Sequence, residues 1–77
     1  MNSKKIVINT IDNVKEFVNI ALRCSFDIDL ISGRYAIDAK SIMGVFSLDL
    51  SKPVTVQVHG EDTKEFFEQI KKFEVEV

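Results

Sequence analysis

The spacing of apolar residues along the chain changes several times between the period of a helix and that of a strand. A β-branched run at residues 6–8 favours a strand. After it, apolar residues at i, i+3, i+4, i+7 and i+8 predict a helix from about Asn13 to about Cys24. Asn13 and Glu16 have the spacing of a capping pair, which supports this start. The apolar face comprises Val14, Phe17, Val18, Ala21 and Leu22.

Strict alternation of apolar and polar residues then predicts a β-hairpin. The two alternating segments are residues 26–30 and 35–39. Ser32-Gly33 lies between them and suits a tight turn. One face of the hairpin is expected to be buried. The residues expected on its solvent side are Asp27, Asp29 and Asp38.

A short helix is predicted after the hairpin. Ser41 suits the N-cap position, and apolar residues follow it at helical spacing. Gly44 weakens the helix by propensity, and Pro53 disfavours helical geometry at the residue before it, so the helix should end before Ser51. The apolar residues at helical spacing are Ile42, Val45 and Phe46.

One more strand and one more helix complete the pattern. Residues 54–59 alternate, with the valines on one face and His59 on the other. Asp62 and Glu65 then have the spacing of a capping pair for a last helix. Residues 74–77 form either a frayed end or a short extended tail. The apolar face of the last helix comprises Phe66, Phe67, Ile70 and Phe73.

The predicted order is therefore β-α-β-β-α-β-α. Strands with one alternating face and three amphipathic helices imply an α+β fold, with a four-stranded antiparallel sheet and all helices on one of its faces. A chain of 77 residues makes one domain, 1–77, with a thin core. Such small chains more often present a surface to a larger partner than enclose a deep catalytic pocket.

Composition excludes several classes of function. The formal net charge is −2 and the basic residues are scattered, so no nucleic-acid footprint is present. No apolar run is long enough to cross a membrane, and the N-terminus has no signal-peptide pattern. Cys24 is the only cysteine, so no internal disulfide can form, and we expect a small buried thiol in a reducing compartment. We therefore expect a cytoplasmic protein.

The residues of enzyme and metal sites are also missing from the sequence. His59 is the only histidine, has no ligand spacing to Cys24, and is expected to be a polar surface residue. No Gly-rich phosphate loop, Ser-His-Asp set or Cys-His pair can be assembled. We therefore predict no enzymatic activity, no metal, no cofactor and no small-molecule substrate.

One segment carries a family resemblance. Residues 40–48, Lys-Ser-Ile-Met-Gly-Val-Phe-Ser-Leu, closely resemble the central segment of HPr, the histidine-containing phosphocarrier of the bacterial sugar phosphotransferase system. The order of elements agrees throughout, and the resemblance implies an HPr-like open-faced β-sandwich. In Gram-positive members the serine that matches Ser41 is phosphorylated by HPr kinase, which feeds carbon catabolite repression. The positions that match Ile42, Met43 and Phe46 form an apolar docking patch for partner proteins.

Both assignments have a simpler alternative. Ser41 can act only as an N-cap, contributing about 1 kcal/mol. The three apolar residues can simply pack the short helix onto the sheet. A short, weak helix cannot bury all of these side chains, so we expect Ile42, Met43 and Phe46 to be partly exposed, with Met43 as an adaptable contact.

The sequence departs from the family at the start of the first helix. The family has Gly-Ile-His-Ala-Arg-Pro-Ala there, and counting from the N-terminal strand places Lys15 at the histidine and Phe17 at the arginine. A lysine amine is protonated at neutral pH and cannot accept a phosphoryl group in place of an imidazole. Phe17 fits the buried face rather than an anion site. The chain is also about five residues shorter before the hairpin.

Three functions remain open at this point. The first is a regulatory or adaptor protein derived from HPr, with Ser41 as its switch and HPr kinase or a transcriptional regulator of catabolite repression as partner. The second is a working component of the phosphotransferase system despite the substitutions. The third is a plain protein-interaction module without phosphorylation. Loss of both the histidine and the arginine argues against the second function.

Overall fold

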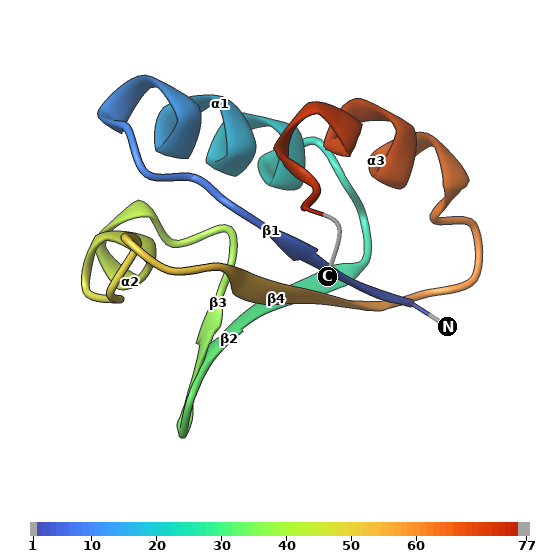
Figure 1. Cartoon of the computed structure of the whole chain (residues 1–77). Coiled ribbons are helices and arrows are strands. Elements are labelled where there is room, and N and C mark those ends of the chain that lie inside the picture. Colours follow the sequence, from blue (N-terminus) through green and yellow to red (C-terminus); the bar gives the residue numbers. More distant parts are fainter. Residues whose placement is uncertain (1, 76–77) are drawn as a thin grey trace.

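The predicted order of elements is confirmed in a computed structural model, which describes residues 2–75 (Figure 1). A 3₁₀ turn, η1, follows the last helix. The elements are β1 (Ser3–Ile6), α1 (Ile11–Leu22), β2 (Asp27–Ser32), β3 (Tyr35–Asp38), α2 (Ile42–Phe46), β4 (Val54–His59), α3 (Lys64–Gln69) and η1 (Lys71–Phe73).

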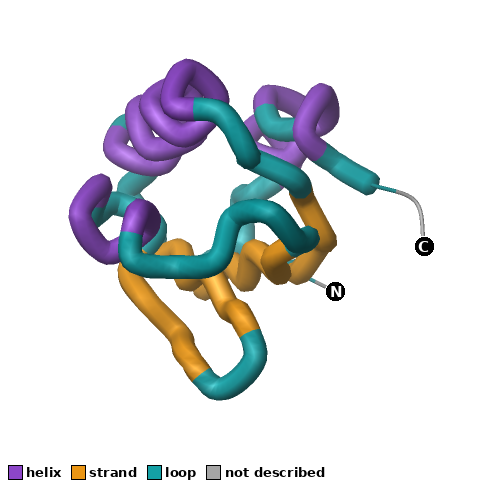
Figure 2. The backbone as a smooth tube through the Cα atoms, turned by 60° about the vertical axis from the view of Figure 1, so that its left-hand side comes forward, coloured by secondary structure: helices purple, strands orange, loops and turns teal. Residues whose placement is uncertain are grey.

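The four strands form one antiparallel sheet in the order β1-β4-β2-β3. Helices α1 and α3 lie side by side over one face of it, and α2 packs beside the N-terminal end of α1 (Figures 1 and 2). No helix of residues 2–75 covers the other face, so the fold is an open-faced α+β sandwich. None of the helices within residues 2–75 is both long and apolar enough to cross a membrane.

The core lies between the sheet and the helices. Val54, Val56 and Val58 of β4 are buried, as their alternation predicts, and they meet the apolar face of α1. Phe66 of α3 is the aromatic centre of this core. Edge-to-face contacts join its ring to three others at centroid distances of 6.3, 6.0 and 5.5 Å, from Phe17, Phe26 and Phe67 respectively.

The predicted start of the first helix is wrong by about half a turn. Helix α1 begins at Ile11, and Thr10 is its N-cap, with its hydroxyl oxygen accepting a hydrogen bond from the Asn13 N–H at 3.1 Å. Asn13 is therefore inside the helix rather than its cap, since the Thr10 hydroxyl already satisfies one of the first N–H groups. Lys15 consequently lies in the second turn of α1. The helix ends at Leu22, before Cys24.

Other predicted boundaries also need correction. The first strand is β1 at 3–6 rather than 6–8, because β4 pairs with the chain from Ser3 onward. Helix α3 has Thr63 at its N-cap position, with no side-chain cap bond, so Asp62 does not cap it. Leu22, assigned to the apolar face of α1, is 56% exposed because it lies at the end of the helix, beyond the buried stripe.

The hairpin turn is also shifted by one residue. Gly33 and Arg34 form it, with Gly33 at φ +59°, a left-handed conformation that glycine adopts without strain. The predicted burial of one hairpin face is confirmed by Ile28 and Leu30, and Asp29 is half-buried on the other face.

The chain after η1 runs as an extended segment along β1. The Val7 N–H donates to the Phe73 carbonyl at 2.9 Å, and the Val75 N–H donates to the Lys5 carbonyl at 3.1 Å. Of the two alternatives for residues 74–77, Glu74 and Val75 therefore follow the extended one, and the rest of that segment lies outside the described residues.

Candidate functional site around Ser41

Ser41 is the N-cap of α2, as the sequence predicts. Its hydroxyl oxygen accepts a hydrogen bond from the Gly44 N–H at 3.2 Å, and the residue is exposed. A cap of this kind holds the side chain in one rotamer while leaving the hydroxyl accessible from solvent. The start of α2 therefore presents a serine oxygen in a fixed position.

Two residues before Ser41 hold the loop in place. The Ser41 N–H donates to the Asp38 carbonyl at 3.0 Å, and the Lys40 N–H donates to Asp38 Oδ1 at 2.9 Å. Lys40 Nζ reaches across to the carbonyl oxygen of Cys24 at 2.9 Å. Ala39 and Val45, on either side of the serine, are fully buried. The Ser41 hydroxyl thus sits on a segment anchored to both β3 and the end of α1.

The loop after α2 is closed by its own hydrogen bonds. Ser47 Oγ donates to the Gly44 carbonyl at 2.6 Å. Asp49 Oδ1 accepts from the Ser51 hydroxyl at 2.6 Å and from the Ser51 N–H at 3.2 Å. These bonds from Ser51 lower the pKa of the Asp49 carboxyl. Asp49 therefore keeps a negative charge beyond the C-terminal end of α2 at neutral pH.

Three apolar side chains of α2 face solvent, and we call Ile42, Met43 and Phe46 the α2 patch. Their exposed fractions are 38, 79 and 44%, so the predicted partial exposure is confirmed. Val45 is the one fully buried residue of α2. The sequence did not predict that Ile11 would also be exposed; it opens α1, at the end that lies beside α2 (Figures 1 and 2). The sequence signal for this exposure was weak, because Ile11 lies before the predicted helix start at about Asn13.

The two residues matched to the phosphocarrier site lie in very different places. Phe17 is fully buried and packs edge-to-face on Phe66, so it contributes to the core and offers nothing to an anion. Lys15 is exposed, and the carboxylate of its neighbour Glu16 pairs with Lys72. At the start of α1, Thr10 is the cap and Asp12 places a carboxylate in the first turn.

His59 lies far from the start of α1. It ends β4, on the face without helices, whereas α1 follows the end of β1 that pairs with Val54. At about 3.3 Å per residue, the five residue steps from Val54 to His59 span about 17 Å. His59 Nε2 contacts Asp29 Oδ2 at 2.8 Å. Sequence reasoning missed this pair, because only the strand register brings the two side chains together.

Three carboxylates surround His59 on the open face of the sheet. Asp27 lies directly opposite His59 in the register, and Asp29 lies opposite Asp38 on the other side of β2. Within residues 2–75, no group of three or more His, Cys, Asp or Glu side chains has the arrangement of a metal site.

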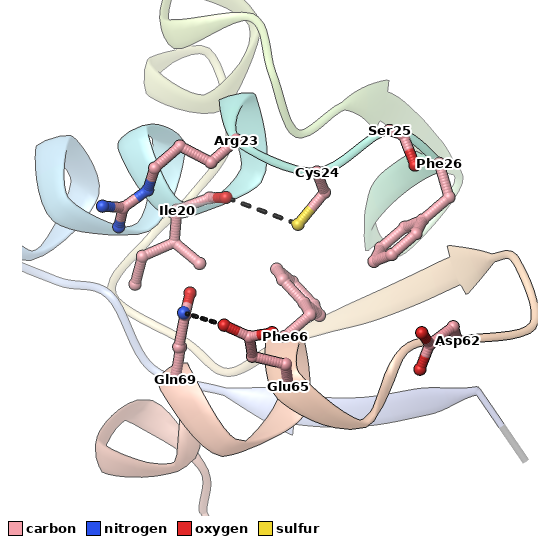
Figure 3. A pocket seen from close by; sticks show the side chains of 9 residues that line it. All are labelled: Ile20, Arg23, Cys24, Ser25, Phe26, Asp62, Glu65, Phe66 and Gln69. Atoms are coloured by element: carbon pink, nitrogen blue, oxygen red, sulfur yellow. Dashed lines mark hydrogen bonds between the residues drawn. The ribbon is translucent and has the colours of Figure 1, made fainter.

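A cavity of about 390 Å³ lies between the C-terminal end of α1 and the start of α3 (Figure 3). Phe26 and Phe66 provide its apolar walls, and Arg23 and Glu65 lie among its polar residues. The Cys24 thiol, half-buried rather than buried as predicted, donates to the Ile20 carbonyl at 3.5 Å. Burial raises the pKa of this thiol, against an opposing effect of Lys40 and Arg23. The thiol is therefore protonated at neutral pH and is a weak nucleophile.

The sheet order and the serine-capped α2 define an open-faced sandwich of the HPr type. A family model described as the PTS HPr component phosphorylation site matches residues 12–74, so the chain belongs to the HPr family. The predicted family is confirmed by this match. Members of this family are phosphocarrier proteins that work through contacts with other proteins, rather than catalysts. No curated protein sequence matches the chain significantly.

Several solved structures have the same fold. HPr-C-His from Thermoanaerobacter tengcongensis superposes with a TM-score of 0.79 at 26% identity, with 94% of this chain and 89% of that chain covered. The catabolite repression protein Crh from Bacillus subtilis has a TM-score of 0.66 at 27% identity, covering 92% and 88%. The phosphocarrier protein HPr from Bacillus anthracis, at 24% identity and a TM-score of 0.73, covers 94% and 95% and shares the fold.

Proposed function

We propose that this HPr-family protein acts as a regulatory or adaptor protein through the Ser41 segment and does not carry a phosphoryl group on histidine. The observation that carries this proposal is the exposed Ser41 hydroxyl, fixed at the start of α2 next to the exposed α2 patch. The same single domain, residues 1–77 in the cytoplasm, would present both features to one partner protein.

Phosphorylation of Ser41 is chemically simple at this position. The Ser41 oxygen attacks the γ-phosphorus of ATP, the bond to the ADP oxygen breaks, and the hydroxyl proton leaves to a base of the kinase. HPr kinase would supply the ATP and that base. The added phosphate carries a charge of about −1.5 to −2, and backbone N–H groups at the start of α2 can donate hydrogen bonds to it, so the modification is compatible with a folded helix.

The phosphocarrier activity of the family uses a histidine and an arginine, and the matched positions of this chain have neither. We infer that the phosphohistidine site is degenerate at Lys15 and Phe17, the positions given by the sequence count. The start of α1, with Thr10 as the N-cap and Ile11 and Asp12 in the first turn, offers no imidazole or guanidinium either. His59 is held by Asp29 on the opposite side of the sheet, so it is not a substitute.

Partner docking follows from the exposed apolar side chains beside Ser41. Exposed apolar clusters on a small domain mark interfaces more often than they mark random surface. Met43, the most exposed of the three residues in the α2 patch, has a flexible side chain that adapts to different partners. The similarity to the catabolite repression protein Crh of Bacillus subtilis supports a transcriptional regulator of that response as the second partner after HPr kinase.

The experiment that tests this proposal is a pair of phosphorylation reactions read by intact mass. The protein is incubated with HPr kinase and ATP, and separately with enzyme I and phosphoenolpyruvate. We expect the mass of one phosphate to be added in the first reaction only, and to be absent from Ser41→Ala. Ser47→Ala is the matched control, because Ser47 is an exposed serine at the other end of α2 and should leave the modification intact.

The other outcomes each have a definite meaning. Phosphate gained from phosphoenolpyruvate would overturn the proposal in favour of a working phosphotransferase component, with His59 as the only available imidazole. Phosphate on Ser41→Ala in the ATP reaction would remove Ser41 as the switch. No gain in either reaction would leave a plain interaction module that docks through the α2 patch.

A further inference from the structure

The two edge strands of the sheet differ in whether another segment covers them. The edge of β1 is covered, because the segment from Phe73 to Val75 runs along it and exchanges backbone hydrogen bonds with Lys5 and Val7. At the opposite edge, β3 pairs with β2 alone among the described residues. An uncovered edge strand is a template for pairing with another strand. Figure 1 shows the β2–β3 hairpin projecting away from α1 and α3, where a second chain has access.

The backbone groups on the outer side of β3 follow from the ladder. The Ala39 N–H donates to the Ile28 carbonyl at 2.9 Å, so the odd-numbered residues of β3 turn their peptide groups towards β2. Ala36 and Asp38 therefore turn theirs outwards. The Asp38 carbonyl accepts from Ser41, which leaves the Asp38 N–H and both groups of Ala36 for a partner strand.

Only some of the features that protect an edge strand are present in β3. Native proteins blunt an edge with short strands, charged side chains, proline, a bulge or a covering segment. β3 is short, at four residues, and carries Asp38, but it has no lysine, no proline and no bulge. The strand reads Tyr-Ala-Ile-Asp, and its pairing with β2 is continuous from Ser32↔Tyr35 to Asp29↔Asp38. Tyr35 is 71% exposed, the second highest value among the large apolar side chains described.

We propose that β3 pairs antiparallel with β3 of a second copy of this chain, with Ala36 on the two-fold axis. This register places Tyr35 of each copy opposite Ile37 of the other, and Arg34 of each copy opposite Asp38 of the other. Side chains directly opposite in an antiparallel pair lie on the same face of the sheet. The result is one continuous eight-stranded sheet with a self-complementary interface, as two-fold symmetry requires.

Each cross-strand pair in this register is of a favourable type. Tyrosine opposite isoleucine is an aromatic and β-branched pair, and it covers the exposed Tyr35 ring. The small Ala36 side chains meet on the axis without a clash. Arginine opposite aspartate is an opposite-charge pair, repeated at both ends of the interface. Asp38 Oδ1 already accepts from the Lys40 N–H, so Oδ2 remains for the guanidinium of Arg34.

Neighbouring registers lose these features. With Ile37 on the axis, Asp38 faces Ala36 and both opposite-charge pairs disappear. With Asp38 on the axis, two carboxylates meet directly, which is destabilising. Charge complementarity therefore selects Ala36 as the centre of the interface.

The size of the interface sets the expected strength. A pair of four-residue strands buries much less than the roughly 1,000 Å² of a stable dimer, so the association is weak and reversible. We expect it to appear at protein concentrations of about a millimolar. This pairing involves neither phosphorylation of Ser41 nor the α2 patch, so it stands or fails independently of the proposed function.

The test is sedimentation equilibrium of the full chain across a concentration series, with amide NMR spectra of the same samples. We expect concentration-dependent dimerisation, with the Ala36 and Asp38 amides shifting most. Arg34→Asp creates two carboxylate pairs and should weaken the association about tenfold. Arg23→Asp, the same change at an exposed arginine at the end of α1, is the matched control and should leave it unchanged.

Two further variants keep the test decisive. A mixture of Arg34→Asp and Asp38→Arg proteins should form heterodimers, because each end of the mixed interface again pairs opposite charges. If Asp38→Arg fails to fold, Ala36→Pro removes the outward N–H at the centre and should abolish association. A chain that stays monomeric at every concentration overturns the proposal. Association that Arg34→Asp leaves unchanged also overturns the proposal, and this is the result expected if two copies exchange a whole element. Association that only Met43→Lys removes overturns it as well, because the α2 patch would then form the interface.

Discussion

Lys40 and Cys24 are joined by a hydrogen bond from the lysine Nζ to the cysteine carbonyl oxygen at 2.9 Å. The bond links the residue before Ser41 to the segment directly after α1, two residues beyond Leu22. A lysine near a helix C-terminus also interacts favourably with the helix dipole. The position of Ser41 therefore depends on α1 as well as on its own helix.

Removing this lysine should loosen the Ser41 segment. We expect Lys40→Met to lower the free energy of unfolding by about 1–2 kcal/mol, because a half-buried charged hydrogen bond is lost and the Cys24 carbonyl is left without its donor. Urea unfolding gives the energy, and hydrogen exchange of the Ser41 amide reports the local effect. Lys71→Met, at an exposed lysine, should change the stability by less than about 0.5 kcal/mol. Equal effects of both substitutions would contradict this role of Lys40.

Restoring an arginine at the position predicted from the family should unfold the protein rather than rebuild a phosphate site. Phe17 is fully buried against Phe66, so Phe17→Arg places a charge without a partner in the core. We expect a loss of more than about 3 kcal/mol, measured by thermal unfolding. Phe17→Leu keeps the site apolar and should cost far less. A Phe17→Arg protein as stable as the unsubstituted chain would contradict this role of Phe17 in the core.

The order of elements was predictable because its signals are local. The strand period appears in the valines at 54, 56 and 58, and the helical period appears in Val14, Phe17 and Ala21. The burial of these residues follows that spacing. The exposure of the α2 patch was predictable for the same reason, since five residues are too few to bury every apolar side chain of α2.

The errors and omissions arose where local signals compete or where register decides. Thr10 with Asn13 and Asn13 with Glu16 both have cap spacing, and the sequence offers no way to choose between them; the structure uses Thr10. The bond from Lys40 to Cys24 and the pair of His59 with Asp29 join residues 16 and 30 positions apart. Such contacts follow from strand register and loop path, which apolar spacing does not encode.

The thiol of Cys24 should titrate above its ordinary range. Burial raises its pKa above the ordinary value of 9.0, so the folded protein binds this proton more tightly than the unfolded chain does. The resulting stabilisation is fully present below pH 9.0 and is lost as pH rises through the higher pKa of the folded state. Alkylation by iodoacetamide, followed against pH in folded and urea-unfolded protein, measures both values. A folded midpoint at or below the unfolded one would contradict the burial of the thiol, and Cys24→Ala should lose this component of the pH dependence of stability.

The pair formed by His59 and Asp29 should contribute little to stability despite its short distance of 2.8 Å. The side chains of His59 and Asp29 keep 48 and 39% of their surface exposed, so water and salt screen the interaction. A double-mutant cycle with Asp29→Asn and His59→Gln should give a coupling energy of about 0.2–1 kcal/mol that falls at 1 M salt.

Asp27 provides the matched control for this cycle. It lies directly opposite His59 in the register of β2 and β4, whereas Asp29, two residues along β2, makes the hydrogen bond. A cycle with Asp27→Asn and His59→Gln should therefore give the smaller coupling energy of the two. If the Asp27 cycle gave the larger value, proximity in the register rather than the bond to Asp29 would govern the orientation of His59. In that case Asp27, and not Asp29, would hold the only imidazole of this chain on the open face of the sheet.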